Sequence, residues 1–117
     1  MIDEVAAGKL RAKVVRGAAN NQLATTEDGD RLAERDILYA PDYVVNAGGI
    51  INVAAKYLGW PQADSNARVE ATADRLADVF THGKTHGVAP QTAADQLARQ
   101  RIAKASLDAP DELAVAA

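Results

Sequence analysis

The sequence predicts an α/β fold with short parallel strands and a predominantly helical C-terminal half. Two strand candidates, residues 12–16 and 37–40, flank a helix candidate at 27–35, which is the order of a parallel βαβ unit. Apolar residues then recur at helical spacing through the rest of the chain, and 26 of the 117 residues are alanine, the strongest helix former. A chain of this length predicts a single domain.

The two strand candidates end in residues that interrupt regular structure. The first contains the β-branched pair Val14-Val15, which predicts burial on both faces, and it ends at Gly17. The second ends at Pro41. Acidic residues in the first turn of the helix between them favour helix formation there.

Three helices are expected after the second strand. Asn46 is a plausible N-cap for a helix that carries Ile50, Val53 and Tyr57 on one face and ends at Gly59. As long as no ligand is assigned, such an apolar face indicates ordinary core packing.

The two later helices are defined by glycine and proline. The periodicity of apolar residues predicts a helix over 66–82, and Gly83 and Gly87 predict a turn after it. Pro90 is expected to open the last helix, which ends near residue 106. Residues 107–117 are expected to form a frayed tail.

Composition and charge exclude several classes of function. Thirteen basic residues against 16 acidic residues give a net charge of -3, so no nucleic-acid partner is expected. The absence of cysteine excludes disulfides, a thiol nucleophile and cysteine-ligated metals. No apolar run reaches the roughly 18–20 residues that span a bilayer, and the N-terminus lacks a signal peptide, which predicts a cytoplasmic protein without a membrane partner.

Two parallel strands make an incomplete sheet. Parallel sheets are normally buried between helices, and a two-stranded one leaves two unpaired edges. The missing strands are expected either from another copy of the chain, which predicts a homo-oligomer, or from a longer polypeptide of which this chain is the C-terminal piece.

Polar and small residues follow each strand candidate, at the edge where ligands bind in open α/β sheets. Residues 17–22 (GAANNQ) combine small residues with carboxamides, and residues 41–49 (PDYVVNAGG) precede a helix N-terminus. On pattern alone, the first segment is more often a simple turn.

The same two segments resemble the C-terminal part of the glutamate/leucine/phenylalanine/valine dehydrogenase family, nearest to leucine and valine dehydrogenases. The resemblance rests on residues 13–23 (KVVRGAANNQL) and 37–53 (ILYAPDYVVNAGGIINV) and continues through 92–95 and 101–103. It implies that residues 1–106 are the C-terminal portion of a Rossmann-like NAD-binding domain. It also implies oxidative deamination of an L-amino acid to a 2-oxo acid, with NAD as the cofactor.

The resemblance assigns roles to seven residues. It implies that the nicotinamide end of NAD lies over the turn, and that Asn21 also lies beside the substrate carboxylate. Ile50 and Val53 would line the substrate side-chain pocket, and both are aliphatic, as a branched-chain substrate requires. The turn residues assigned to the cofactor are Gly17, Ala18, Ala19, Asn20 and Asn21.

Other parts of the family pattern are absent. No Gly-x-Gly-x-x-Gly turn occurs, and none of the five lysines lies in a catalytic context of the family, so no catalytic residue is assigned. The chain is therefore expected to be inactive alone. The alternative is a noncatalytic truncated paralogue that acts as an oligomerisation or interaction module. His82 and His86 are expected to be exposed turn residues and not metal ligands, because Gly83 separates them.

Overall fold

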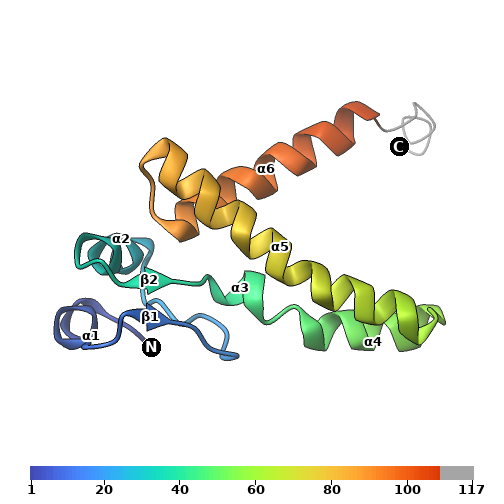
Figure 1. Cartoon of the computed structure of the whole chain (residues 1–117), viewed down its shortest axis with the longest axis horizontal. Helices are drawn as coiled ribbons and strands as arrows, with labels where there is room; N and C mark the ends of the chain where they lie inside the picture. The colour runs from blue at the N-terminus through green and yellow to red at the C-terminus, as the bar shows by residue number, and fades with distance from the viewer. Residues whose placement is uncertain (109–117) are drawn as a thin grey trace, which may run out of the picture.

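The computed structural model describes residues 1–108 and confirms the α/β class, with two short parallel strands and mainly helical structure. The elements in chain order are α1 (Glu4–Lys9), β1 (Val14–Val15), α2 (Thr26–Glu34), β2 (Leu38–Tyr39), α3 (Asp42–Val45), α4 (Gly48–Leu58), α5 (Gln62–His86) and α6 (Pro90–Asp108). Figure 1 shows the small sheet with α1 and α2 at one end of an elongated molecule and α4 and α5 extending from it.

The predicted βαβ unit is present. β1 and β2 pair in parallel, with Val14 opposite Leu38 and Val15 opposite Tyr39. α2 connects them, and its first turn is held by the Asp28 carboxylate, which accepts hydrogen bonds from the N–H and hydroxyl of Thr25 at 3.0 and 3.1 Å. Because the strands are parallel, their carboxyl ends meet at one edge of the sheet.

The strands are not buried on both faces, and that prediction is wrong. Tyr39 is 2% exposed, but Val14 and Leu38, which lie opposite each other on the other face of the sheet, are 57% and 42% exposed. The β-branched pattern correctly identified a strand, but burial depends on a covering layer that residues 1–108 do not supply for this face.

Two separate apolar clusters form the core of residues 1–108. The N-terminal cluster packs α1 against α2 and β2, and its buried members are Ala7, Leu32, Ile37 and Tyr39. The helix α1, which the sequence analysis did not predict, closes it, with the Asp3 carboxylate accepting a hydrogen bond from Ala6 N–H at 2.8 Å. The C-terminal cluster packs α5 against α6 around Val79, Ala93 and Ala94.

Gln91 joins the two clusters across α2 and α6. The residue is only 5% exposed, and its Nε2 donates to the Thr26 carbonyl at 3.1 Å and to Asp30 Oδ1 at 3.0 Å. The hydroxyl of Tyr43 donates to the Gln91 carbonyl at 3.1 Å. We call this set of contacts the Gln91 junction.

The helical half follows the prediction at Gly59 but departs from it at Gly83. α4 ends as predicted, with Gly59 in the left-handed conformation at φ 67°. α5, however, continues through Gly83 to His86, so the predicted turn at Gly83 is wrong. A Cβ on Gly83 would lie 2.9 Å from the Val88 carbonyl, which explains why glycine occupies this helical position where the chain turns back.

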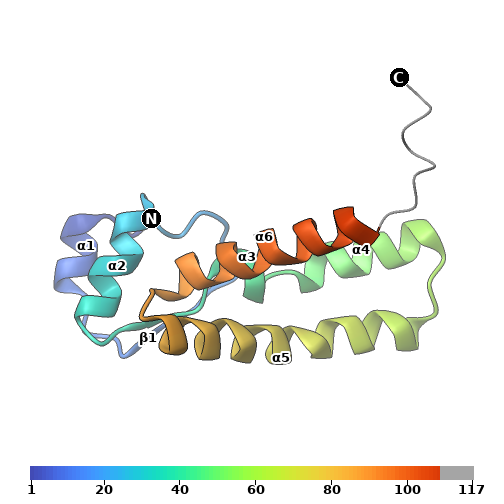
Figure 2. The ribbon, with the colours of Figure 1, turned by 90° about the horizontal axis from the view of Figure 1, so that it is seen from above.

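The last helix begins at Pro90 as predicted. In Figure 2, α6 and α5 run from their shared turn toward the same end of the molecule, and Figure 1 shows that α6 diverges from α5 along the way. α6 extends to Asp108, two residues past the predicted end of the helix at 106, and residues 109–117 of the predicted tail lie outside the described residues. Within residues 1–108, no helix combines the length and apolarity needed to cross a membrane.

Candidate functional site

The two segments that follow the strands lie side by side. Asn46 Nδ2 donates to the Ala18 carbonyl at 3.5 Å and also to Asn20 Oδ1. Gln22 N–H donates to Asp42 Oδ2 at 3.0 Å. The parallel pairing of β1 and β2 brings both segments to one edge, as the sequence analysis predicted, and these contacts join the 17–22 turn to α3.

Asn21 has an unusual conformation within this turn. Its φ is 52°, in the left-handed region, which costs an L-residue about 1–2 kcal/mol and which asparagine tolerates better than most residues. The residue is exposed, and no hydrogen bond joins its carboxamide to another described residue. The turn therefore presents a free donor and acceptor pair at the carboxyl edge of the sheet.

The rest of the turn is small and open. Ala18, Ala19 and Asn20 are exposed, and Gly17 is half-buried. The turn is spanned by Gln22, whose Nε2 donates to the Ala19 carbonyl at 3.1 Å and lies 2.7 Å from where a Cβ on Gly17 would stand. Away from the Gln22 side chain, Ala18 and Ala19 carry only a methyl group and are exposed, so a planar group can approach the turn closely there.

A polar hollow of about 290 Å³ adjoins Asn21. Tyr43 reaches across it to Asp95, with 3.1 Å between the hydroxyl and Oδ1. Burial, followed by the neighbouring Asp95 carboxylate, raises the pKa of Tyr43 above its ordinary value, so its hydroxyl stays protonated into alkaline solution. The residues that line this hollow include Asn21, Thr25, Tyr39, Asp42, Tyr43, Gln91 and Asp95.

Ile50 and Val53 do not pack into the core, so the alternative of ordinary core packing for this face is wrong in the described chain. They are 71% and 66% exposed, and Tyr57 on the same helix is 89% exposed. Ile50 borders a second hollow between α4 and α5, whereas Asn21 borders the first. Within the described residues, Asn21 and the aliphatic face thus lie at separate hollows.

Two further predictions about polar residues need correction. Asn46 is not the N-cap of α4, because that helix begins at Gly48 after Ala47, and Asn46 instead ends α3 and bonds the turn. His82 and His86 lie on one continuous helix, with their rings stacked 4.0 Å apart, and not in a turn. No group of three or more potential metal ligands occurs among the residues that the structure describes.

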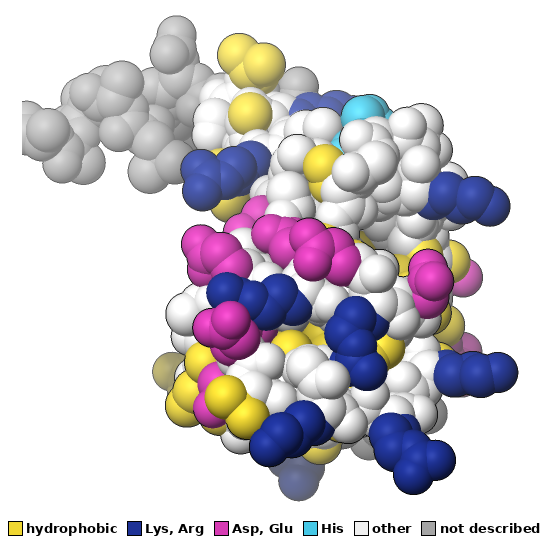
Figure 3. All heavy atoms as spheres, turned by 90° about the vertical axis from the view of Figure 1, so that its left-hand side faces the viewer, with side chains coloured by type: hydrophobic (Ala, Val, Ile, Leu, Met, Phe, Trp, Pro, Cys, Tyr) yellow, Lys and Arg dark blue, Asp and Glu magenta, His cyan; other side chains and the backbone are white. Residues whose placement is uncertain are grey.

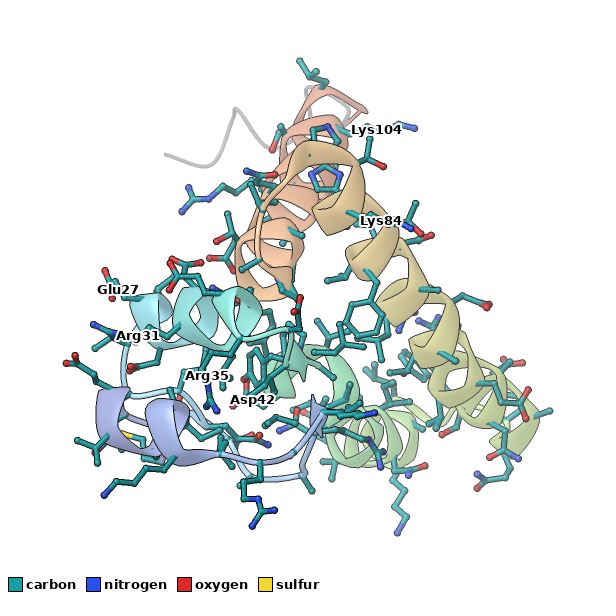
Figure 4. All side chains as sticks on the ribbon, turned by 60° about the vertical axis from the view of Figure 1, so that its left-hand side comes forward. Glu27, Arg31, Arg35, Asp42, Lys84 and Lys104 are labelled. Atoms are coloured by element: carbon teal, nitrogen blue, oxygen red, sulfur yellow. The ribbon has the colours of Figure 1, made fainter. Side chains whose placement is uncertain are left out.

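The five lysines lie on the surface of the described chain. Lys9, Lys13, Lys56, Lys84 and Lys104 are all exposed. In Figure 4, Lys84 and Lys104 lie on the outside of α5 and α6, whereas Asp42 lies between the ribbons. Figure 3 shows acidic and basic side chains together on the end of the molecule formed by α1 and α2, without a uniformly basic patch on that face.

Sequence reasoning missed Asp42, which is only 6% exposed and holds the turn. The available signal was an acidic residue placed directly after Pro41 at the carboxyl end of the second strand. Nothing in the sequence shows that its partner is a backbone N–H twenty residues earlier.

Comparison with known proteins places these segments among dehydrogenases. The profile of the glutamate/leucine/phenylalanine/valine dehydrogenase family matches residues 1–109. A leucine dehydrogenase from Bacillus cereus is 48% identical over 95 residues, and a valine dehydrogenase from Streptomyces coelicolor is 49% identical over 96. These matches cover 81% and 82% of this chain, but 26% of each relative, so the chain spans about a quarter of their length.

A solved structure shows the same arrangement of elements. The crystal structure of L-tryptophan dehydrogenase from Nostoc punctiforme superposes with a TM-score of 0.83 at 37% sequence identity. The match covers 89% of this chain and 31% of that chain.

Proposed function

This chain belongs to the glutamate/leucine/phenylalanine/valine dehydrogenase family, and we propose that it is part of an NAD-dependent L-amino acid dehydrogenase. In this proposal, residues 1–106 form the C-terminal portion of a Rossmann-like NAD-binding domain. The observation that carries the proposal is Asn21, whose free carboxamide stands at the carboxyl edge of the parallel strands, where ligands bind in such sheets.

The turn suits a nicotinamide ring. The small exposed residues Ala18 and Ala19 leave room for a flat group, and the Asn21 carboxamide would hydrogen-bond to it or to the substrate carboxylate. When bound, NAD would supply the hydride acceptor, while the residues of this chain would bind and orient. Gly17 and Asn20 complete the cofactor-binding set of the proposal.

The proposed substrate class rests on two residues of α4. Ile50 and Val53 offer an exposed aliphatic surface, which favours a branched-chain L-amino acid because contact with an aliphatic side chain removes this apolar surface from water. The product would be the corresponding 2-oxo acid. Two leucine dehydrogenases and a valine dehydrogenase among the relatives support this choice.

A graft tests the proposal. The matching 95-residue stretch of the Bacillus cereus leucine dehydrogenase is replaced by that of this chain. We expect leucine-dependent NADH formation to persist, and we expect Asn21→Ala to lower kcat/KM roughly tenfold or more, since a hydrogen bond to a charged group is lost. The unfused chain is expected to show no such activity. Hydride transfer from the amino acid also needs a group that accepts a proton, and the five lysines of this chain are all exposed, so none is assigned that role.

The matched control is Asn66→Ala, which changes an exposed asparagine on α5 that contacts only Gln62 among the described hydrogen bonds. Its kcat/KM should equal that of the unsubstituted graft. A folded graft without activity, or one in which both asparagine variants behave alike, would contradict the proposal.

The exposed apolar surface favours a second candidate, a noncatalytic oligomerisation module. Val14 and Leu38 leave one face of the sheet uncovered, and Ile50, Val53 and Tyr57 leave α4 uncovered. A second copy of the chain could cover both surfaces.

Light scattering after size-exclusion chromatography separates the two candidates. The module predicts a stable, discrete oligomer of the 12.3 kDa chain at micromolar concentration. A discrete oligomer together with an inactive graft would favour the module, whereas a monomer would remove the support that the uncovered surfaces give it.

A further inference from the structure

The buried carboxylate of Asp42 has no role in the function proposed above, yet it has a defined hydrogen-bond partner for each oxygen. It is 6% exposed, and no salt bridge pairs it with a basic residue among residues 1–108. A buried carboxylate is costly unless its oxygens accept hydrogen bonds. Each oxygen does so: Oδ2 accepts Gln22 N–H at 3.0 Å, and Oδ1 accepts Tyr43 N–H at 2.7 Å.

The position of Asp42 is itself rigid. It directly follows Pro41, which is fully buried and whose carbonyl accepts the N–H groups of Val44 and Val45 at 3.0 and 3.1 Å. Its own N–H lies 3.4 Å from the Tyr39 hydroxyl oxygen. The carboxylate therefore projects from a fixed point at the end of β2.

Its distant partner is the residue that follows Asn21. Gln22 is held at three points: its N–H by Asp42, its carbonyl by Ile2 N–H at 2.6 Å, and its side chain by the Ala19 carbonyl at 3.1 Å. On the other side of Asn21, Asn20 is bonded by Asn46. Asn21 thus keeps its left-handed backbone between two anchored neighbours, and a strained residue persists only where its surroundings fix it in this way.

We propose that Asp42 is a positioning residue, which fixes the 17–22 turn through Gln22 N–H and so orients the Asn21 carboxamide toward the ligand. Anchoring of the turn stands on the geometry alone. Its consequence for catalysis rests on the proposed function. Asp42 acts through Asn21 and is not required to touch substrate or cofactor.

Amide hydrogen exchange in the full 117-residue chain tests the anchor. Asp42→Ser keeps a small oxygen near Tyr43 N–H but is too short to reach Gln22, so we expect exchange at Gln22 to accelerate roughly tenfold, the factor that corresponds to one hydrogen bond. Exchange at Val79 in α5 should be unchanged. Asp42→Ala, which removes both acceptors, should accelerate exchange at both Gln22 and Tyr43.

The matched control is Asp95→Asn, which removes a negative charge from the same hollow without touching the turn. It should leave Gln22 exchange unchanged. Unaltered Gln22 exchange in folded Asp42 variants would overturn the proposal. Global unfolding of both variants would also overturn it, because Asp42 would then support the whole fold and not the turn.

A double-mutant cycle in the grafted enzyme tests the consequence for catalysis. Asp42→Ser should lower kcat/KM roughly tenfold when Asn21 is present and less than about twofold in the Asn21→Ala background. Equal losses in both backgrounds would contradict action through Asn21. If the unsubstituted graft is inactive, the proposed function fails, while the exchange experiment still decides whether Asp42 anchors the turn.

Discussion

Leu32→Ala is expected to lower the free energy of unfolding by about 2–5 kcal/mol, a large share of the stability of a small domain. Leu32 is fully buried in the N-terminal cluster, beside Ala7, Ile37 and Tyr39. Ala7 is too small to refill the space, and Tyr39 is held in β2, so we expect a cavity to remain. Urea denaturation followed through the amide NMR signals of α2 measures the effect where the cavity forms.

Leu107→Ala provides the control for this substitution. Leu107 is also helical but 86% exposed, so its truncation should change stability by no more than about 0.5 kcal/mol. Equal effects of the two substitutions would show that Leu32 is not the centre of the N-terminal cluster.

Gly29→Ala is expected to destabilise the chain by about 1–3 kcal/mol even though alanine is the better helix former. A Cβ on Gly29 would lie 2.3 Å from Gln91 Cδ, far inside contact distance. Gln91 is buried and bonded to Thr26 and Asp30, so it moves only by giving up those bonds. Thermal unfolding of the variant measures the loss.

Gly8→Ala is the matched substitution, since Gly8 is also helical but nothing lies within 4 Å of its Cβ position. It should raise stability by roughly 0.5–1 kcal/mol. Combining Gly29→Ala with Gln91→Ala should cost less than the sum of the two single changes, because the overlap is then absent. A Gly29→Ala chain as stable as the Gly8→Ala chain would show that the Gln91 side chain moves aside without a loss of stability.

The elements that local rules control were predictable from sequence. The order of strand, helix and strand defined the parallel pair, Gly59 ended α4, and Pro90 began α6. The error at Gly83 came from a propensity argument, because packing against the Val88 carbonyl outweighs the low helix propensity of glycine. α1 was missed because six residues that include Gly8 carry little helical signal of their own.

The candidate site likewise has one feature that the sequence predicted and others that it did not. That the 17–22 turn meets the segment after β2 follows from parallel strands ending at one edge, and this was predicted. The bond between Asp42 and Gln22 was not predictable, since burial and pairing across twenty residues depend on the folded chain. The exposure of Ile50 and Val53 was not predictable either, because an amphipathic pattern identifies an apolar face but not what packs against it.

The two apolar clusters share no member, and the Gln91 junction joins them through hydrogen bonds. Such a chain can open in two cooperative units of unequal stability. The 17–22 turn follows β1 in the smaller, N-terminal unit, so a partial opening there removes the Asn21 surface while α4, α5 and α6 keep their helical structure. Where the N-terminal unit opens first, far-UV ellipticity, which those helices dominate, overstates the temperature to which the candidate site survives.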